Sequence, residues 1–202
     1  MKRGWRLAVL LLVGGVIGAA VPTGGFAEEA RDASLYVGVK ACGICHKKDE
    51  SGNQLAKWKE GPHAKTFEVL GTDKAKEPAA KKGVTDPQHS PKCLRCHSTA
   101  YNWTEEVATQ KIQPEDGVTC ESCHGPGKKY MMKETMKSRE KSIAAGMIYP
   151  ATKSCPNCHN DQNPTYKPDR YTTKDGKKVD FDPEQAAEKI KHPNPLVAHE
   201  AK

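Results

Sequence analysis

The stretch CGICH at residues 42–46 decides how this chain of 202 residues folds, because its Cys-x-x-Cys-His pattern occurs three more times. The other copies are CLRCH at 93–97, CESCH at 120–124 and CPNCH at 155–159. Together the four copies use all 8 cysteines of the chain. This pattern is the attachment site of a c-type haem, whose vinyl groups bond to both thiols while the histidine ligates the iron.

The pattern predicts four covalently attached haem c groups, one for each motif. We expect attachment through Cys42, Cys45, Cys93, Cys96, Cys120, Cys123, Cys155 and Cys158, and proximal ligation by His46, His97, His124 and His159.

Two other interpretations of the cysteines compete with haem. Four Cys-x-x-Cys pairs would also supply two four-cysteine zinc sites, and an exported chain permits disulfides. Neither requires a histidine directly after the second cysteine of every pair. The four histidines therefore favour haem over both alternatives.

The N-terminus has the features of an export signal. Lys2, Arg3 and Arg6 form a basic region, residues 7–20 are apolar, and residues 25–27 offer a small-residue cleavage site. An uncleaved membrane anchor is the alternative, although the apolar run is short for a membrane span, which needs about 20 residues. We predict a signal peptide at 1–27, a periplasmic location and one multihaem cytochrome domain at 28–202.

The composition is poor for a conventional hydrophobic core. Only 36% of the residues are hydrophobic and 6% are aromatic. Four macrocycles would supply the apolar surface that the side chains lack. We therefore expect the haem-free chain to be largely unfolded.

The formal net charge of +7 is not evidence for a nucleic-acid partner. Three of the cations lie in the predicted signal peptide, and each haem would add two propionates. The lysine clusters are therefore interpreted as a solvated surface, and no nucleic acid is expected.

Helices with long irregular loops are the expected architecture, with little strand. We predict helices over residues 54–63 and 128–145, and a third over 183–191 that begins with the N-cap Asp182 and Pro183. Residues 72–91 and 160–178 are rich in Pro, Gly and Lys and are expected to be irregular connections. Residues 194–202 are expected to be a frayed tail.

Four histidines remain as candidates for the second axial position of a haem. His63, which follows Gly61-Pro62, and His192, at the end of the last helix, are expected to be distal ligands. His89 is either a surface or supporting residue or the ligand of another haem, and His199 is expected to be free. A haem without a second ligand would be open to small molecules.

The chain resembles the tetrahaem cytochrome c-554 family of nitrifying bacteria. The resemblance rests on residues 36–38 (YVG), Trp58, residues 63–65 (HAK), and the stretch GVTCESCHGPG at 117–127. The order and spacing of the motifs and the final helix carrying His192 agree as well, so that the resemblance covers most of the chain after the signal.

The resemblance implies a largely helical fold around close-packed haem pairs. It implies that His63 is the distal ligand of the haem on His124, and His192 of the haem on His159. It further implies a five-coordinate haem on His97. Members of the family carry electrons in the periplasm, and nitric oxide reduction at the open haem has been proposed for them.

The sequence departs from the family where the first haem should obtain its distal histidine. Residues 125–150 contain no histidine but contain four methionines. Met136 or Met132, expected on one helix face, would ligate the haem on His46 through sulfur and raise its reduction potential. The alternatives are that these methionines pack against haem edges or that His89 is the ligand.

The expected function is electron relay between redox proteins through stacked haems, with partners that include membrane-associated proteins. One alternative is an enzyme that reduces nitric oxide at the haem on His97, with a small gaseous ligand bound there and His89 as proton donor. Another is a subunit of a cytochrome filament, in which a neighbouring chain supplies the missing ligand.

Overall fold

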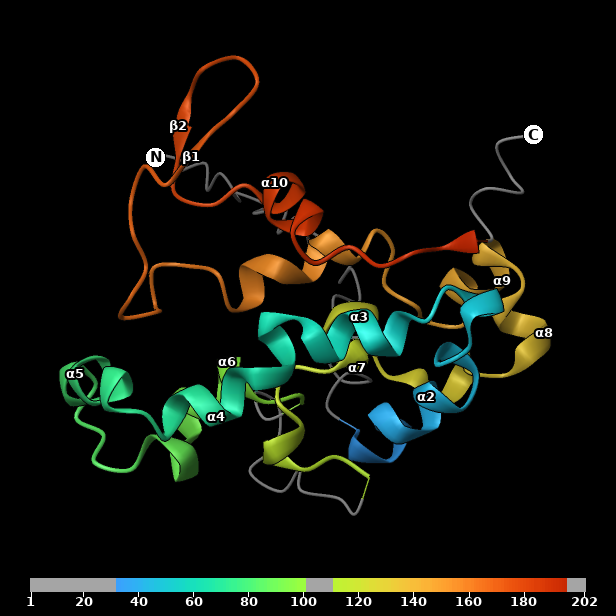
Figure 1. Cartoon of the computed structure of the whole chain (residues 1–202), viewed down its shortest axis with the longest axis horizontal. Helices are drawn as coiled ribbons and strands as arrows, with labels where there is room; N and C mark the ends of the chain where they lie inside the picture. Colours follow the sequence, from blue (N-terminus) through green and yellow to red (C-terminus); the bar gives the residue numbers. More distant parts are fainter. Residues whose placement is uncertain (1–31, 101–110, 196–202) are drawn as a thin grey trace, which may run out of the picture.

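Short helices joined by irregular loops make up the fold (Figure 1). The computed structural model describes residues 32–100 and 111–195. The predicted signal peptide, His199 and most of the predicted tail lie outside the described residues. In the described part, no helix is both long and apolar enough to cross a membrane.

The helices and strands are short throughout. The α-helices are α2 (Val39–His46), α3 (Gln54–Glu60), α4 (Thr66–Leu70), α5 (Asp73–Lys81), α6 (Pro91–His97), α7 (Cys120–His124), α8 (Lys133–Met136), α9 (Arg139–Ala144) and α10 (Pro183–Glu188). The 3-10 helices are η1 (Ala33–Leu35), η2 (Asp49–Ser51), η3 (Pro62–Lys65), η4 (Pro87–His89), η5 (Pro114–Asp116), η6 (Gly127–Lys129) and η7 (Ala151–Asn157). The antiparallel hairpin pairs β1 (Tyr171–Thr172) with β2 (Lys178–Val179).

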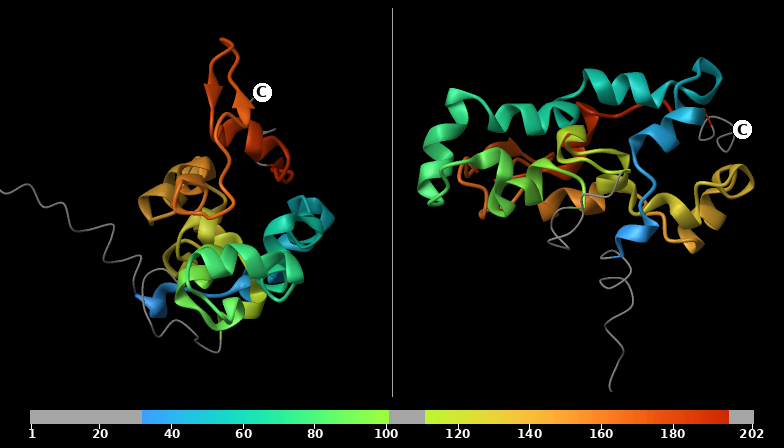
Figure 2. Two further views of the ribbon diagram at one scale, coloured as in Figure 1. Left: turned by 90° about the vertical axis from the view of Figure 1, so that its left-hand side faces the viewer. Right: turned by 90° about the horizontal axis from the view of Figure 1, so that it is seen from below.

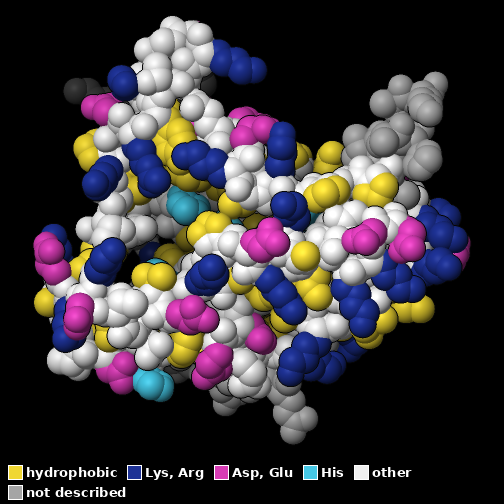
Figure 3. All heavy atoms as spheres, viewed as in Figure 1, with side chains coloured by type: hydrophobic (Ala, Val, Ile, Leu, Met, Phe, Trp, Pro, Cys, Tyr) yellow, Lys and Arg dark blue, Asp and Glu magenta, His cyan; other side chains and the backbone are white. Residues whose placement is uncertain are grey.

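The elements are spread along one long axis (Figures 1 and 2). Helices α4, α5 and α6 lie at one end, α2, α8 and α9 lie at the other, and α3 and α7 lie between them. The hairpin and α10 form a separate layer beside this row. The space-filling view shows a hollow between that layer and the helical row, with histidine at its floor (Figure 3).

The predicted helical character is confirmed, but two segments differ from expectation. A continuous helix over residues 128–145 was wrong, because Met132 is extended (ψ 137°) and Ser138 begins a new helix by accepting a hydrogen bond from the Lys141 amide. The connection at 72–91 was also wrong in part, since it contains α5.

The remaining helix predictions are close to the structure. Residues 54–63 form α3 and the start of η3, with an extended Gly61 between them. Asp182 caps α10 by accepting hydrogen bonds from the amides of Glu184 and Gln185, as predicted, although the helix ends at Glu188.

The buried apolar core is small. One cluster joins Tyr36, Ala100 and Ile112, which are 1%, 6% and 3% exposed. Several large apolar side chains lie at the surface, including Ile44 inside the first motif (66% exposed) and Ile143 on α9 (44% exposed). The side chains alone therefore bury little apolar surface to stabilise this fold.

Candidate functional site

Each Cys-x-x-Cys-His motif occupies a short helix. Helices α2, α6 and α7 end at the histidine of their motif, and the fourth motif runs through η7 and just beyond it. Residues three and four positions apart share one face of a helix, so the two cysteines and the histidine of α2, α6 and α7 project on one side. None of the eight cysteines forms a disulfide. This arrangement presents three bonding groups to a single flat cofactor.

Two contacts between cysteines join motifs that are far apart in the sequence. The Cys42 side chain lies against Cys120. The Cys158 side chain lies against Cys96, and its sulfur is 4.0 Å from the carbonyl oxygen of Arg95 in the second motif. The first motif therefore lies against the third, and the second against the fourth.

The zinc interpretation requires four donors around one point. Within residues 32–100 and 111–195, no group of three or more His, Cys, Asp or Glu side chains is arranged to hold a metal ion.

Four histidines face each other in two pairs. The ring centroids of His63 and His159 are 6.1 Å apart, and those of His124 and His192 are 6.0 Å apart. A histidine nitrogen lies about 2 Å from a bound transition metal, so one iron between two imidazoles separates the ring centroids by about 6 Å. Both pairs therefore fit the two axial positions of a haem.

The pairing of the distal histidines differs from the one that the resemblance implied. His63 was expected to serve the haem on His124 but faces His159, and His192 was expected to serve the haem on His159 but faces His124. The fold explains this difference, because it brings the fourth motif close to η3, the 3-10 helix that contains His63. After α10 the chain runs back alongside α3, where Gln54 Nε2 donates a hydrogen bond of 2.9 Å to the carbonyl oxygen of Pro193. This path brings His192 to the third motif.

The other two motif histidines, for which residues 32–100 and 111–195 supply no ring partner, have fixed orientations. His46 Nδ1 lies 3.0 Å from Gln54 Oε1, and His97 Nδ1 lies 2.8 Å from the carbonyl oxygen of Thr66. An oxygen can only accept here, so each Nδ1 carries the hydrogen and each Nε2 keeps its lone pair. Metal-binding histidines are oriented in this way.

Burial favours the neutral imidazole, the form that binds a metal, at His63, His124 and His159. Burial lowers the pKa of His124 to about 4, with smaller contributions from His192 and His46. Burial also lowers the pKa of His63, and that of His159, where His63 adds to the effect.

Glu121, inside the third motif, ties this motif to the start of α2. Its side chain is 2% exposed, and its carboxylate accepts hydrogen bonds from the amides of Val37 (3.0 Å), Gly38 (2.9 Å) and Gly127 (2.7 Å). Burial raises the pKa of the Glu121 carboxyl, whereas the three hydrogen bonds act to lower it; the effect of burial is the larger. The carboxylate thus holds the first and third motifs together.

A second set of bonds ties His63 to the segment before the third motif. The Val118 amide donates to the His63 carbonyl (3.1 Å), and Trp58 Nε1 donates to the Val118 carbonyl (2.8 Å). Gly117 has a positive φ of 69°, and a Cβ there would lie 2.8 Å from the His63 carbonyl oxygen. The stretch 117–127 and the Trp58–His63 region are therefore one structural unit.

An aromatic stack supports the fourth motif. Phe181 lies parallel to His159 with ring centroids 4.6 Å apart, and Tyr171 of β1 meets Phe181 edge-on. The hairpin layer thus fixes one side of the His159 imidazole.

The remaining predicted ligands do not face another histidine. His89 is bonded to Asp86 (2.8 Å), and its side chain is 80% exposed. Met132 is 66% exposed and lies just before α8. It was expected to share a helix face with Met136, and it does not. Met136 Sδ lies 3.9 Å from Ser142 Oγ, in the junction between α8 and α9.

Several supporting residues carried no sequence signal that identified their roles. Gln54, Thr66 and Phe181 contact the motif histidines His46, His97 and His159. These contacts form only when the chain folds, so the sequence alone did not indicate them. Glu121 lies inside the stretch 117–127 on which the resemblance rests, but its hydrogen bonds to three backbone amides are seen only in the structure.

Comparisons with known proteins point to one family of cytochromes. The profile of the family described as "Cytochrome c554 and c-prime" matches residues 41–125, which contain the first three motifs. The protein named cytochrome c-554 of Nitrosomonas europaea is 28% identical over 166 residues, which cover 74% of this chain and 68% of the relative. No solved structure gives a significant match.

These matches confirm the resemblance identified from the motifs. A c-type cytochrome binds haem covalently, and an electron-transfer cytochrome exchanges electrons with redox partner proteins. The comparisons support the cytochrome c-554 family for this chain, and that family suggests electron transfer by a c-type cytochrome.

Proposed function

We propose that this chain is a periplasmic tetrahaem cytochrome that relays electrons between redox proteins through stacked haems. Residues 1–27 are the signal peptide that exports it, and residues 28–202 form the cytochrome domain. The observation that carries the proposal is the contact of motifs in two pairs: Glu121 of the third motif is bonded to the start of α2, and Cys158 of the fourth motif lies 4.0 Å from the carbonyl oxygen of Arg95 in the second. Attachment points in contact support cofactors held side by side.

The ligands of the proposal follow from the histidine geometry. His46, His97, His124 and His159 are the proximal ligands, and His63 and His192 are the distal ligands that face His159 and His124. Haem c supplies reversible one-electron chemistry at its iron. The protein binds the cofactors and orients the imidazoles of His46 and His97 through Gln54 and Thr66.

Mass spectrometry of the purified mature protein tests the proposal. We expect the mass of residues 28–202 plus four haems, and a reductive titration that takes up four electrons. A mass with fewer haems, or a chain that retains residues 1–27, would contradict the corresponding part of the proposal. Replacing Cys120 and Cys123 by Ser should remove one haem and one electron.

A second candidate function is reduction of a small nitrogen oxide at the haem on His97. It is supported by His97, which is oriented by Thr66 and has no ring partner within the described residues. The expected sign is a high-spin signal that disappears when nitric oxide is added, followed by consumption of nitric oxide with an electron donor. Binding without consumption would leave electron relay as the function of this site.

A further inference from the structure

The positive charge of the chain is concentrated in one segment. Three of the 32 Lys and Arg residues lie in the predicted signal peptide, so residues 28–202 carry four more cations than their 25 Asp and Glu residues. Residues 128–141 alone contain six Lys or Arg and two Glu, which is the same excess of four. The remainder of the predicted domain is therefore neutral in formal charge, and the propionates of the proposed haems would make it negative.

Three lysines of this segment surround one carboxylate at the surface. Lys133 lies in α8, Lys137 ends that helix, Lys141 lies in α9, and all three are exposed. Lys137 Nζ is 3.0 Å from Glu134 Oε1. The hydrogen bond and the charge of Lys137 lower the pKa of the Glu134 carboxyl, and the charges of Lys133 and Lys141 add to this effect. We call these three lysines the α8–α9 lysine cluster; one carboxylate leaves it with an excess of positive charge.

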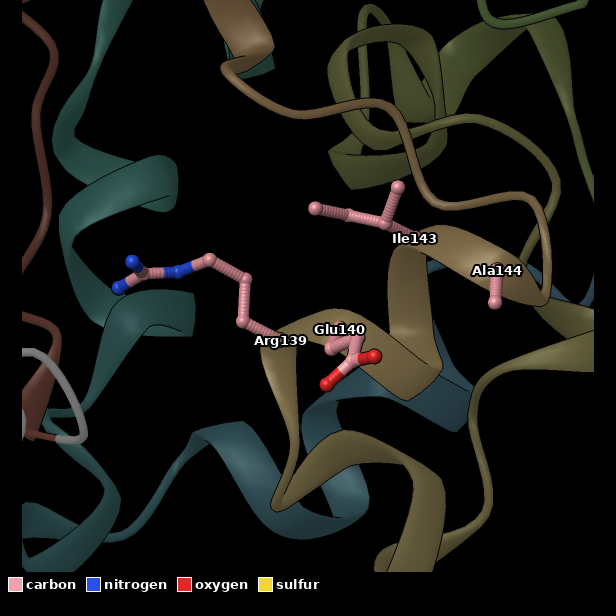
Figure 4. A pocket seen from close by; sticks show the side chains of 4 residues that line it. All are labelled: Arg139, Glu140, Ile143 and Ala144. Atoms are coloured by element: carbon pink, nitrogen blue, oxygen red, sulfur yellow. The ribbon is translucent and has the colours of Figure 1, made fainter.

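Other side chains make the contact between α8 and α9. Ser142 is 1% exposed, and its hydroxyl donates a hydrogen bond of 3.0 Å to the carbonyl oxygen of Thr135. Arg139 and Ile143 project together to one side of α9 (Figure 4). Lys141 is two residues from each of them, about 200° around the helix, and so lies on the opposite side. The lysine cluster is therefore distinct from the helix junction and from the Arg139 side of α9.

Both ends of the segment are bonded to the third motif. The Tyr130 hydroxyl donates a hydrogen bond of 2.6 Å to the carbonyl oxygen of Gly125, the residue after the motif. The Ile148 amide donates one of 2.9 Å to the carbonyl oxygen of His124. Lys and Arg side chains gather at the end of the molecule where α8 and α9 lie (Figure 3). A protein bound to the lysine cluster would therefore contact a part of the chain that begins and ends at an attachment site.

We propose that the α8–α9 lysine cluster is the docking surface for an acidic redox protein. This inference rests on the proposed function, since a relay must exchange electrons with a partner, and it names the surface and the chemistry of that partner. A carboxylate-rich surface would be attracted by this segment and repelled by the rest of the holoprotein, which speeds encounter and selects one orientation. The sequence alone had suggested only a solvated surface for the lysines.

An anionic membrane is the other negatively charged surface that lysines attract. Glu134 favours a protein partner, because its carboxylate lies among the three lysines and would meet the like charge of a uniformly anionic layer. A protein surface can instead place a neutral or cationic group opposite Glu134.

Electron transfer from reduced plant-type ferredoxin, a small acidic protein, tests the proposal on the oxidised holoprotein. Each reduced iron–sulfur cluster loses one electron, and one ferric haem iron gains it, which stopped-flow absorbance follows. Replacing Lys133, Lys137 and Lys141 together by Gln should lower the second-order rate constant at low salt about tenfold. At high salt the variant and the unaltered protein should react equally fast, because the charges are screened.

A variant with Lys74, Lys76 and Lys81 replaced by Gln is the matched control. It removes three exposed cations from α5, which lies at the opposite end of the molecule from α8 and α9 (Figures 1 and 2). Its rate constant at low salt should fall less than about twofold, because distant charges are screened. Equal losses in the two triple variants would overturn the proposal, since the net charge alone would then explain the rate.

Two further outcomes separate the possible failures. Vesicles of phosphatidylglycerol that bind the holoprotein but not the α8–α9 triple variant, with an unchanged reaction with ferredoxin, would assign the surface to a membrane and contradict the proposal. A holoprotein that dithionite fails to reduce would instead contradict the proposed function. A holoprotein that dithionite reduces, and whose reaction with ferredoxin is insensitive to the lysine cluster, would contradict the docking surface alone.

Discussion

The imidazoles of His63 and His159 face each other across 6.1 Å with their planes inclined by 62°, whereas those of His124 and His192 are inclined by 43° across 6.0 Å. The anisotropy of a low-spin ferric haem increases as its two axial imidazoles approach a perpendicular arrangement. The two histidine pairs should therefore give different signals in electron paramagnetic resonance.

His63→Ala should convert the haem on His159 from low-spin to high-spin and remove the more anisotropic low-spin signal, because His63 belongs to the pair with the larger angle. His192→Ala should remove the less anisotropic signal. The measurement is the spectrum of each oxidised variant at low temperature. Loss of the opposite signal in each variant would contradict the ring angles on which this assignment rests.

Glu121→Gln should destabilise the holoprotein by about 1–3 kcal/mol, since an amide cannot accept all three backbone hydrogen bonds and brings N–H groups towards amide donors. Guanidinium unfolding followed by far-ultraviolet circular dichroism measures this. Glu134→Gln is the matched control, because Glu134 is exposed and forms an ion pair with Lys137, three residues further along the chain. Equal midpoints for both variants would contradict the bridging role of Glu121.

The pH dependence of stability gives a separate test of Glu121. Burial raises the pKa of its carboxyl above the ordinary 4.5, so the folded state retains this proton longer than the unfolded state. The contribution of this group to the free energy of unfolding is greatest at low pH and falls as the pH rises from about 4.5 through the raised pKa. Glu121→Gln should flatten this part of the stability profile, and an unchanged slope would contradict the assignment.

Gly117→Ala should disturb the His63 side of the haem on His159. A Cβ at Gly117 would lie 2.8 Å from the His63 carbonyl oxygen, whereas at Gly83, which also has a positive φ, it would meet no atom within 4 Å. Both variants carry backbone strain, but only Gly117→Ala should raise the high-spin fraction in the visible spectrum. Equal spectra for the two would mean that the contact is relieved without moving His63.

The sequence predicted the attachment residues and the helical character because both depend on local patterns. Cys-x-x-Cys-His needs one helical turn, and Asp182 caps α10 through bonds to residues two and three positions away. The partners of His63 and His192 depend on contacts across more than 60 residues, which no local pattern records. The predicted helix over 128–145 was wrong because the Ser138 side chain accepts a hydrogen bond from the Lys141 amide and so starts a new helix.

Haem attachment should be required for folding, because side chains provide little of the core. The described buried cluster contains only Tyr36, Ala100 and Ile112, while Ile44 and Ile143 remain largely exposed. Residues 28–202 produced without haem attachment should therefore show little helix by circular dichroism and no cooperative thermal transition. The matched control is the holoprotein of the same residues. A cooperative transition in the haem-free chain would show that the polypeptide contacts, including those of Glu121, suffice to fold it.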